Sequence, residues 1–374
     1  MTPRRILLLS LAAPALARAQ DSSTAITTAA ARFRVANWAT GLQNPWGGAF
    51  LPDGRLLVTE RPGRLRLITP DGAVSAPLAG VPPVEAQGQG GLLDVVLAPD
   101  FAVSRLIWLS SATAIPGGVV TRLWRAELTP SGLAGLTGVL DATPAQARGR
   151  FHYGGRIAFS PDGQHIFLTT GERNEVRERA QSLGDLAGKV LRLTARGEVP
   201  RDNPFAGQAG ARPEIWSLGH RNPQGIAFNP ATGTLFSAEF GPLGGDELNI
   251  IRPGLNYGWP IITHGRNYSG SIITDRTSAP GFEDPARVWV PAISPSGLTF
   301  GSGAAFPGWR NSALLGCLNP TGLLRLPMAG DTPGREERML EGKARIRHIL
   351  FDAAGLAYLL VDDRGGGILR LEPA

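Results

Sequence analysis

One short phrase recurs along the chain: a turn of the Pro-Asp-Gly type, followed directly by a run of β-forming apolar residues. A turn signal that leads into such a run is typical of a strand. In several copies a second run follows at once, as in GRLRLI from Gly63 and GKVLRL from Gly188. This density of strands and turns predicts antiparallel units repeated along the chain. The copies differ in strength but share this order, and they lie at 51–54, 98–101, 160–163, 229–233 and 352–355.

The number of repeats points to one architecture. The chain has 374 residues, and 49 glycines and 31 prolines supply the many tight turns that short strands need. A mature length of about 355 residues, divided by about 45 to 60 residues per blade, gives six to eight units. We therefore expect an all-β fold, a six-bladed β-propeller of four-stranded antiparallel blades. A β-helix or two sandwiches remain as alternatives, although a sandwich would not repeat one phrase five times.

The first residues read as an export signal. Arg4 and Arg5 precede an apolar stretch at 6–16, and a small-x-small cleavage site follows at 17–19. We predict a signal peptide at 1–19, a single propeller domain at 20–374, and a periplasmic or secreted location. An ordinary Sec signal is the simple interpretation, and the arginine pair leaves the twin-arginine route open. The stretch is too short to span a bilayer.

Charge and cysteine content exclude some classes of function. The chain carries 37 Lys+Arg against 31 Asp+Glu, a formal charge of +6. Three of these arginines lie in the first 20 residues, so the remainder carries +6 − 3 = +3. No basic run with interleaved aromatic residues accompanies this charge, so we expect no nucleic-acid partner. The lone Cys317 is expected to be a buried, unpaired thiol.

Three glycine-rich clusters concentrate polar side chains. They lie at 151–156, 219–225 and 239–247. His152 precedes a predicted strand, where an imidazole can point into a central pocket and act as a general base; alternatively it is a structural hydrogen-bonding group. Arg221 and Asn222 supply planar donors for an anionic or carbonyl-rich ligand, or else cap a turn.

The third cluster offers oxygen ligands. Exposed backbone carbonyls at Gly241 and Pro242, with the carboxylates of Asp246 and Glu247, are of the type that calcium prefers, although such loop carboxylates are often only solvated. A G-x-S-x-G elbow, a P-loop and a CxxC pair are missing from the sequence. The glycines at 88–91 lack a βαβ context, which disfavours a nicotinamide cofactor.

Together these blocks resemble a known family. The segments GHRNPQGIAF (219–228) and GGDELNIIRPGLNYGWP (244–260) are similar to those of the soluble quinoprotein glucose dehydrogenases and aldose sugar dehydrogenases, also called glucose/sorbosone dehydrogenases. The resemblance covers nearly the whole mature chain in the same order. It continues through 44–65, 88–101, 152–163, 188–205 and 344–355.

The resemblance implies a six-bladed propeller that holds pyrroloquinoline quinone (PQQ) and calcium (Ca²⁺), and that oxidises the anomeric hydroxyl of an aldose to a lactone. Carried over residue by residue, it implies that His152 is the base and that Gln89 lies near substrate and base. Arg221 and Asn222 would contact the quinone oxygens, with Arg221 stabilising developing charge. Electrons would pass to an external acceptor, either a quinone or a cytochrome, and a cytochrome must be a separate protein because the chain has no CxxCH.

The same resemblance assigns the remaining cofactor and metal contacts. Arg345 and Arg347 match an arginine pair that clamps the carboxylates of the cofactor. The carbonyls of Gly241 and Pro242 match ligands of the cofactor's calcium, which acts there as a Lewis acid. Glu247 and the carbonyl of Tyr257 match part of a second, structural calcium site.

Several positions depart from the family pattern. Phe240 stands where a hydrogen-bonding residue is usual, Leu318-Asn319 where many members have a lysine, and His348 where aspartate is common. The tryptophan that often precedes the PxxxPSG segment in the family is shifted here, to Trp289. Loss of one charge-assisted contact costs about 1.5 to 3 kcal/mol. A non-redox propeller that serves as a carbohydrate-binding or scaffold protein is therefore the alternative, and we find no ligand set for a metal-dependent lactonase.

Overall fold

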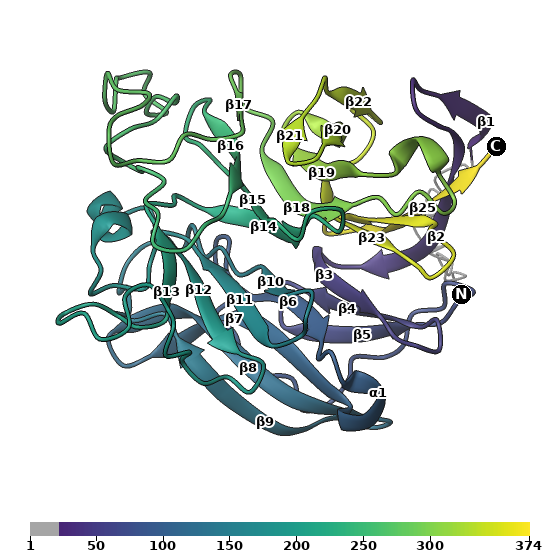
Figure 1. The fold of residues 1–374 in the computed structure, drawn as a ribbon. Helices are drawn as coiled ribbons and strands as arrows, with labels where there is room; N and C mark the ends of the chain where they lie inside the picture. Colours follow the sequence, from purple (N-terminus) through teal and green to yellow (C-terminus); the bar gives the residue numbers. More distant parts are fainter. Residues whose placement is uncertain (1–21) are drawn as a thin grey trace, which may run out of the picture.

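The computed structural model describes residues 22–374, which form six antiparallel sheets arranged as a six-bladed β-propeller (Figure 1). The predicted fold class is confirmed. The predicted signal peptide, 1–19, lies outside the described residues. Within them, no helix is long and apolar enough to cross a membrane.

The blades follow one another along the chain, each strand pairing with the next. The first three contain β3 (Pro45–Phe50), β4 (Leu56–Glu60) and β5 (Arg64–Ile68); β6 (Leu92–Leu97), β7 (Leu106–Ile115), β8 (Gly118–Thr129) and β9 (Gly132–Asp141); and β10 (Ile157–Phe159), β11 (His165–Thr170), β12 (Lys189–Thr194) and β13 (Ile215–Leu218).

The other three blades complete the ring. They contain β14 (Pro223–Phe228), β15 (Leu235–Glu239), β16 (Asp246–Ile250) and β17 (Arg287–Trp289); β18 (Pro295–Phe300), β19 (Ser312–Leu318), β20 (Thr321–Ala329), β21 (Thr332–Pro333) and β22 (Glu337–Met339); and β23 (Ile346–Phe351), β24 (Ala357–Val361) and β25 (Gly366–Pro373) with β1 (Ser22–Thr27) and β2 (Arg32–Leu42). Three blades thus have the predicted four strands, the first has three, and the last two have five. The short helices are α1 (Phe101–Ser104), η1 (Arg177–Gln181) and η2 (Pro307–Trp309).

The recurring turn phrase has one structural role. All five copies connect the innermost strand of a blade to its second strand. At 160–163, Asp162 accepts a hydrogen bond from the backbone N–H of Gln164 (3.0 Å), and Gly163 takes a positive φ of 70°. The fifth blade lacks the phrase, because η2 occupies its corresponding connection. This explains why five copies serve six blades.

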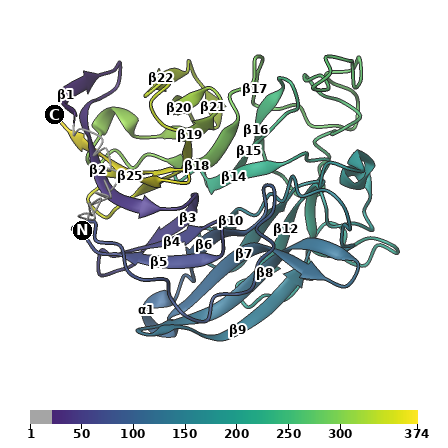
Figure 2. The same ribbon diagram turned by 180° about the vertical axis from the view of Figure 1, so that it is seen from behind.

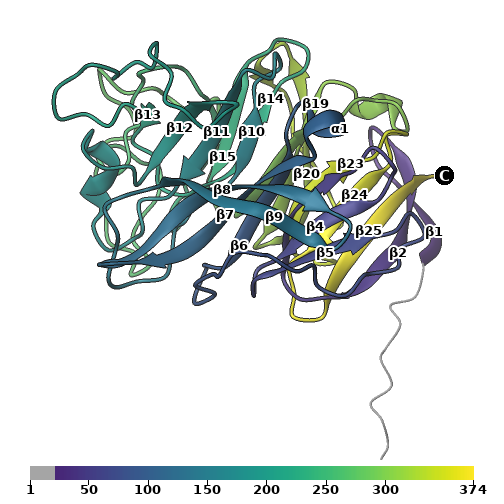
Figure 3. The same ribbon diagram turned by 90° about the horizontal axis from the view of Figure 1, so that it is seen from below.

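The ring is closed by the two ends of the described chain. β2 pairs antiparallel with β25, from Phe33 opposite Pro373 to Leu42 opposite Gly366, so an N-terminal strand completes the last blade. Figures 1 and 2 show these strands side by side, with the C-terminus at the end of β25, and Figure 3 shows the same closure from below. The innermost strands β3, β6, β10, β14, β18 and β23 contact one another around the axis.

The apolar core lies between adjacent blades rather than at one centre. One cluster joins the second and third blades through Trp108, Leu123, Ile166 and Leu191, all fully or almost fully buried. Equivalent clusters fill the other inter-blade spaces. Cys317 is buried and unpaired, as predicted.

We call the face at which the innermost strands begin the pocket face. The loops at 172–186 and 262–287 reach this face; the backbone N–H of Leu243 donates to the carbonyl of Arg266 at 2.9 Å. The loop at 196–213 begins on the opposite face, where the N–H of Ala195 donates to the carbonyl of Gln164. The chain leaves β12 at that end, and β13 pairs antiparallel with β12 and runs back toward the pocket face.

Candidate functional site

A cavity of about 370 Å³ opens on the pocket face. Its walls are formed by the ends of strands and the loops beside them in five of the six blades; no residue of the third blade lines it. Three of the predicted site residues, Gln89, Arg345 and Arg347, line it. The other lining residues are Asn44, Trp46, Arg61, Gly88, Gln224, Phe240, Tyr268, Ser294, Leu318 and Asp362.

The cavity is strongly cationic. Arg347 forms an ion pair with Asp362 and donates to Gln224 Oε1 (2.6 Å), while Arg345 lies 3.6 Å from the same carboxylate. Burial raises the pKa of Asp362, but Arg347 and Arg345 outweigh that effect and hold it at about 2. One carboxylate therefore faces three guanidinium groups, since Arg61 also lines the cavity. This arrangement suits a ligand with several negative charges.

His152 lies beside this cavity, held from two directions. Its backbone N–H donates to Gln89 Oε1 (2.9 Å), and its Nδ1 is 2.9 Å from Glu172 Oε1. Its backbone has a left-handed φ of 49°, a conformation that stores strain in a residue with a side chain. Burial lowers the pKa of His152, as does Arg221, whereas Glu172 opposes the shift. The ring is thus mostly neutral near pH 7, and no group of the described residues engages its Nε2.

Glu172 was not found from the sequence. Its carboxylate is buried, and its second oxygen accepts from the N–H of Asn174. Burial raises the pKa of Glu172, but His152 outweighs this effect, so the carboxylate stays charged. A buried anion on Nδ1 fixes the tautomer that leaves Nε2 free to accept a proton. The only sequence signal was its place just after a strand, at Gly171-Glu172.

Asn222 and Arg221 lie close by but do not line the large cavity. Asn222 Oδ1 accepts from the N–H of Gly154 (3.1 Å), which fixes the loop that carries His152. Arg221 Nη1 donates to the carbonyl oxygens of Phe240 (3.1 Å) and Gly241 (2.7 Å). The guanidinium therefore already holds a carbonyl that was predicted to ligate calcium.

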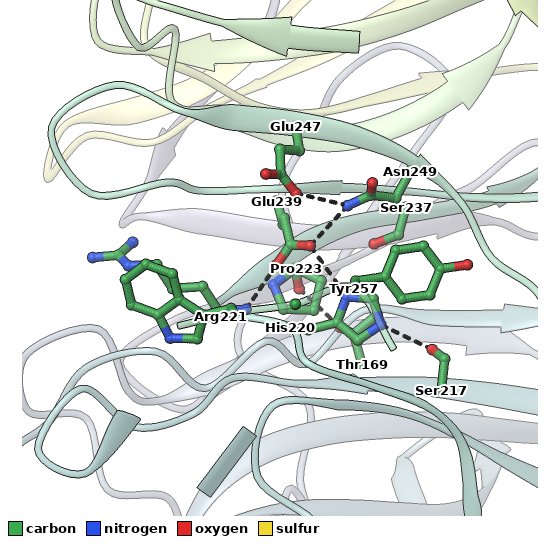
Figure 4. Close-up of polar contacts among 12 residues, drawn as sticks. Thr169, Ser217, His220, Arg221, Pro223, Ser237, Glu239, Glu247, Asn249 and Tyr257 are labelled. Atoms are coloured by element: carbon green, nitrogen blue, oxygen red, sulfur yellow. Dashed lines mark hydrogen bonds and ion pairs between the residues drawn. The ribbon is translucent and has the colours of Figure 1, made fainter. Parts of the chain in front are cut away.

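Behind Arg221 lies a network of buried polar groups (Figure 4). Glu239 accepts from the N–H of Arg221 (2.8 Å) and from Asn249 Nδ2 (2.8 Å), and its Oε1 is 3.1 Å from His220 Nδ1. His220 Nε2 is 2.8 Å from Ser217 Oγ, so the imidazole is held at both nitrogens. The network joins β13, β15 and β16 to the loop that enters β14. It links Arg221 to the acidic residues of the fourth blade.

The residues predicted to bind metal are brought partly together. Gly241, Glu247 and Tyr257 line one small cavity of about 10 Å³, together with Arg221 and Glu239, whereas Pro242 does not line it. Burial raises the pKa of Glu247 well above its ordinary value, and the nearby Glu239 raises it further. A carboxylate buried with so little compensation fits a cation site.

Carboxylates alone would not complete such a site. Between residues 22 and 374, no group of three or more His, Cys, Asp or Glu side chains is arranged to hold a metal. Any ion would depend on carbonyl oxygens, as the sequence predicts. Asn249 adds a buried Oδ1 that has no hydrogen-bond partner.

The departures from the family pattern affect the cavity unequally. Phe240 and Leu318 line it and present apolar groups to a ligand, whereas Asn319 does not. His348 lines a separate cavity of about 240 Å³ around the axis. Trp289, in β17, donates a hydrogen bond to Glu336 (2.8 Å) and does not line the cavity.

Arg156, also missed from the sequence, supports the floor of the cavity. Its guanidinium stacks 3.8 Å from the ring centroid of Trp46 and donates to the backbone carbonyls of Gln224 and Arg347, both at 2.9 Å. Asp94 balances its charge at 3.2 Å. One buried side chain therefore positions three residues that line the pocket.

Comparison with known proteins agrees with this geometry. The model of the glucose/sorbosone dehydrogenase family matches residues 42–370. The chain belongs to that family. The predicted family and enzyme class, a sugar dehydrogenase, are thereby confirmed.

Within the glucose/sorbosone dehydrogenases, several relatives match over nearly their full length. The aldose sugar dehydrogenase YliI of Escherichia coli is 42% identical over 94% of this chain and 96% of its own. A crystal structure of a glucose dehydrogenase superposes with a TM-score of 0.88 at 45% identity, covering 91% of this chain and 99% of that one. The PQQ-bound aldose sugar dehydrogenase of Streptomyces coelicolor superposes with a TM-score of 0.74 at 32% identity, covering 91% and 98%.

Proposed function

We propose that this protein oxidises the anomeric hydroxyl of an aldose to a lactone, or oxidises a related alcohol or aldehyde, and uses PQQ as the hydride acceptor. The observation that carries the proposal is a cationic cavity with a neutral, carboxylate-oriented histidine at its side. The PQQ-bound relative supports the cofactor assignment. The export pattern at 1–19 supports a periplasmic or secreted location.

The residues of the cavity fit a polyanionic quinone. Arg345, Arg347 and Arg61 offer charge-assisted donors to carboxylates, and Asp362 keeps two of these guanidinium groups in place. When bound, PQQ supplies a carbonyl carbon that accepts hydride. Arg156 holds Trp46 and the main chain of Arg347 and Gln224 in place in the cavity wall.

The proton of the sugar hydroxyl is taken by His152. Its Nε2 is free while Nδ1 is engaged by Glu172, so the imidazole accepts the proton at Nε2 and the buried carboxylate stabilises the resulting positive charge. Gln89 fixes the backbone of His152 and lines the cavity, so it keeps the base at the cavity wall. The cofactor's calcium would be held by the carbonyls of Gly241 and Pro242, and a second, structural calcium by the Glu247 carboxylate and the carbonyl of Tyr257 in the smaller cavity.

One titration tests the proposal. Mature apoprotein is titrated with PQQ and calcium while absorbance and thermal stability are followed, and an aldose is added at the end. We expect saturable binding and bleaching of the quinone absorption by the sugar. A His152→Ala variant should bind PQQ but fail to bleach it, and normal turnover in that variant would remove the base assignment.

A non-redox propeller is the second candidate, favoured by Phe240 and Leu318 in the cavity wall. Loss of one charge-assisted contact lowers cofactor affinity by about one to two decades. Absence of PQQ binding well above micromolar concentrations would select this candidate, with the fold retained for carbohydrate binding or scaffolding.

A further inference from the structure

Exposed apolar side chains gather on one face of the propeller. Across residues 22–374, nine large hydrophobic side chains are exposed, and seven of them lie on loops of the pocket face. The other two, Val103 in α1 and Val199 in the loop after β12, lie on the opposite face. Single exposed hydrophobic residues are ordinary, but their concentration on one face marks an interaction site. We call the seven the apolar rim: Phe151, Val176, Leu243, Ile261, Tyr268, Ile272 and Val290.

Most of the apolar rim belongs to the fourth blade and is continuous there. Backbone bridges connect Leu243 to Arg266 and Arg266 to Ile272, so three chain segments lie side by side. A side chain built at Gly244 would meet Val290 at 3.4 Å, which places Val290 over the same turn. Figures 1 and 2 show the long segment between β16 and β17 projecting from the body of the propeller.

The apolar rim borders the mouth of the cavity. Tyr268, 74% exposed, also lines the cavity, and Val290, Ile272 and Leu243 are 66%, 60% and 52% exposed. On the far side, Phe151 immediately precedes His152. A molecule resting on the rim would therefore lie directly over the bound cofactor.

Positive charge surrounds these apolar groups. Arg266 and Arg345 are exposed on this face, and Arg61 and Arg177 are half-buried; Arg177 Nη2 donates to Asn267 Oδ1 (2.7 Å) beside Tyr268. Two acidic residues, at 175 and 178, flank the rim at the edge near Val176. An apolar centre with a charged border is the usual composition of a protein interface. The charge favours an acidic partner.

The proposed reaction requires an external electron acceptor. Conversion of an aldose to a lactone releases two electrons and two protons, and the sequence contains no haem-attachment motif through which the electrons could leave. We propose that the apolar rim is the docking surface for an acidic one-electron carrier protein. Two oxidised carriers in succession each take one electron at the cavity mouth, and the two protons pass to water. This inference rests on the proposed function.

The test compares acceptors and variants of the holoenzyme. The probes are plastocyanin, an acidic one-electron copper protein, and mitochondrial cytochrome c, a basic haem protein; a small dye serves as an acceptor that needs no docking surface. The variants are a triple Leu243→Ser, Ile272→Ser, Val290→Ser change and a charge reversal, Arg266→Glu. The matched control is Val103→Ser with Val199→Ser, which removes exposed valines from the opposite face.

We expect wild-type enzyme to reduce plastocyanin faster than cytochrome c, with a rate constant that falls as salt is added. The triple variant should lose about tenfold or more in plastocyanin reduction and keep its rate with the dye. Arg266→Glu should flatten the salt dependence, and the control should match wild type.

Other results would overturn the inference. Equal loss in the triple variant and the control, or no loss in either, would place docking elsewhere. If the triple variant oxidises an oligosaccharide more slowly than wild type with the dye as acceptor, the rim is a sugar subsite. Conversion of a wild-type dimer to monomer by the triple change would make it a self-association surface. Failure of wild type with the dye itself would refute the proposed function instead.

Discussion

Replacing Glu172 by glutamine tests the role of the His152–Glu172 pair. The amide keeps an oxygen that can accept from Nδ1, 2.9 Å away in the native protein, but removes the negative charge. A hydrogen bond to a charged group contributes about 1.5 to 3 kcal/mol. Since about 1.36 kcal/mol corresponds to tenfold in rate, the plateau of kcat/KM should fall by about tenfold to a hundredfold.

The pH profile gives a second, independent expectation. A base works in its deprotonated form, so kcat/KM rises with pH through the pKa of His152 and then levels off. Burial, together with Arg221, lowers this pKa, so the rise in wild type should be centred below the ordinary value of about 6.5. Glu172 is the group that raises it. In Glu172→Gln the rise should therefore move to still lower pH while the plateau falls.

The assay is initial-rate kinetics of dye reduction by the PQQ- and calcium-loaded enzyme, from pH 4.5 to 8.5 or so. Glu178→Gln, an exposed change on the same loop, is the control and should leave both plateau and midpoint unaltered. A midpoint that stays in place or moves to higher pH in Glu172→Gln would refute the charge interaction with His152. An unchanged plateau would show that the carboxylate does not assist the base.

Three further predictions follow from other contacts. Lys189→Met should lower the free energy of unfolding in urea by about 2 kcal/mol or more, because the ammonium group donates to three buried backbone carbonyls at 2.6 to 3.0 Å that would lose their partner. Arg345→Ala should weaken PQQ binding by about tenfold to a hundredfold in calorimetry and leave the melting temperature of the apoprotein nearly unchanged, because its side chain is 44% exposed and its ion pair with Asp362 is long, at 3.6 Å. Glu247→Gln should abolish the rise in melting temperature that calcium produces in the absence of PQQ; a rise equal to that of wild type would place the ion elsewhere.

The fold was predictable because its signal is local. Each turn phrase specifies a connection between two adjacent strands, and Asp162 and Gly163 show how four residues contain all the information for one such turn. The fifth blade has no turn phrase, because the connection before β19 is built around the buried Trp309 rather than an Asp-Gly turn. The number of strands varies from three to five per blade. It depends on strand pairings at the outer edge of each blade, and the turn phrase does not indicate these pairings.

The sequence located residues at or beside the cavity only where a short block resembles the family, and the catalytic and binding roles of these residues stay predictions. Gln89, His152, Arg345 and Arg347 stand in blocks that resemble the family. Arg156 does not reveal its role in the same way, because its partners come from distant segments; its bond to the carbonyl of Arg347 spans 191 residues.

Side-chain direction was also beyond the sequence. The pattern placed Arg221 among cofactor contacts, yet its guanidinium turns toward the carbonyls of Phe240 and Gly241. That orientation depends on the buried Glu239, which fixes its main chain. The cluster at 219–225 gives no indication of this contact with Glu239, which lies in another strand.

The closure of the ring by β2 and β25 also determines the order in which the molecule can be completed. β2 is among the first segments to be synthesised, and it waits for a partner at residues 366–373. Contacts so distant in sequence form slowly. A nascent or truncated chain with five finished blades exposes two apolar sheet faces, one on the fifth blade and one on the first, and exposed apolar surface is prone to aggregate. Only a chain that has been synthesised through β25 can cover both faces with its last blade.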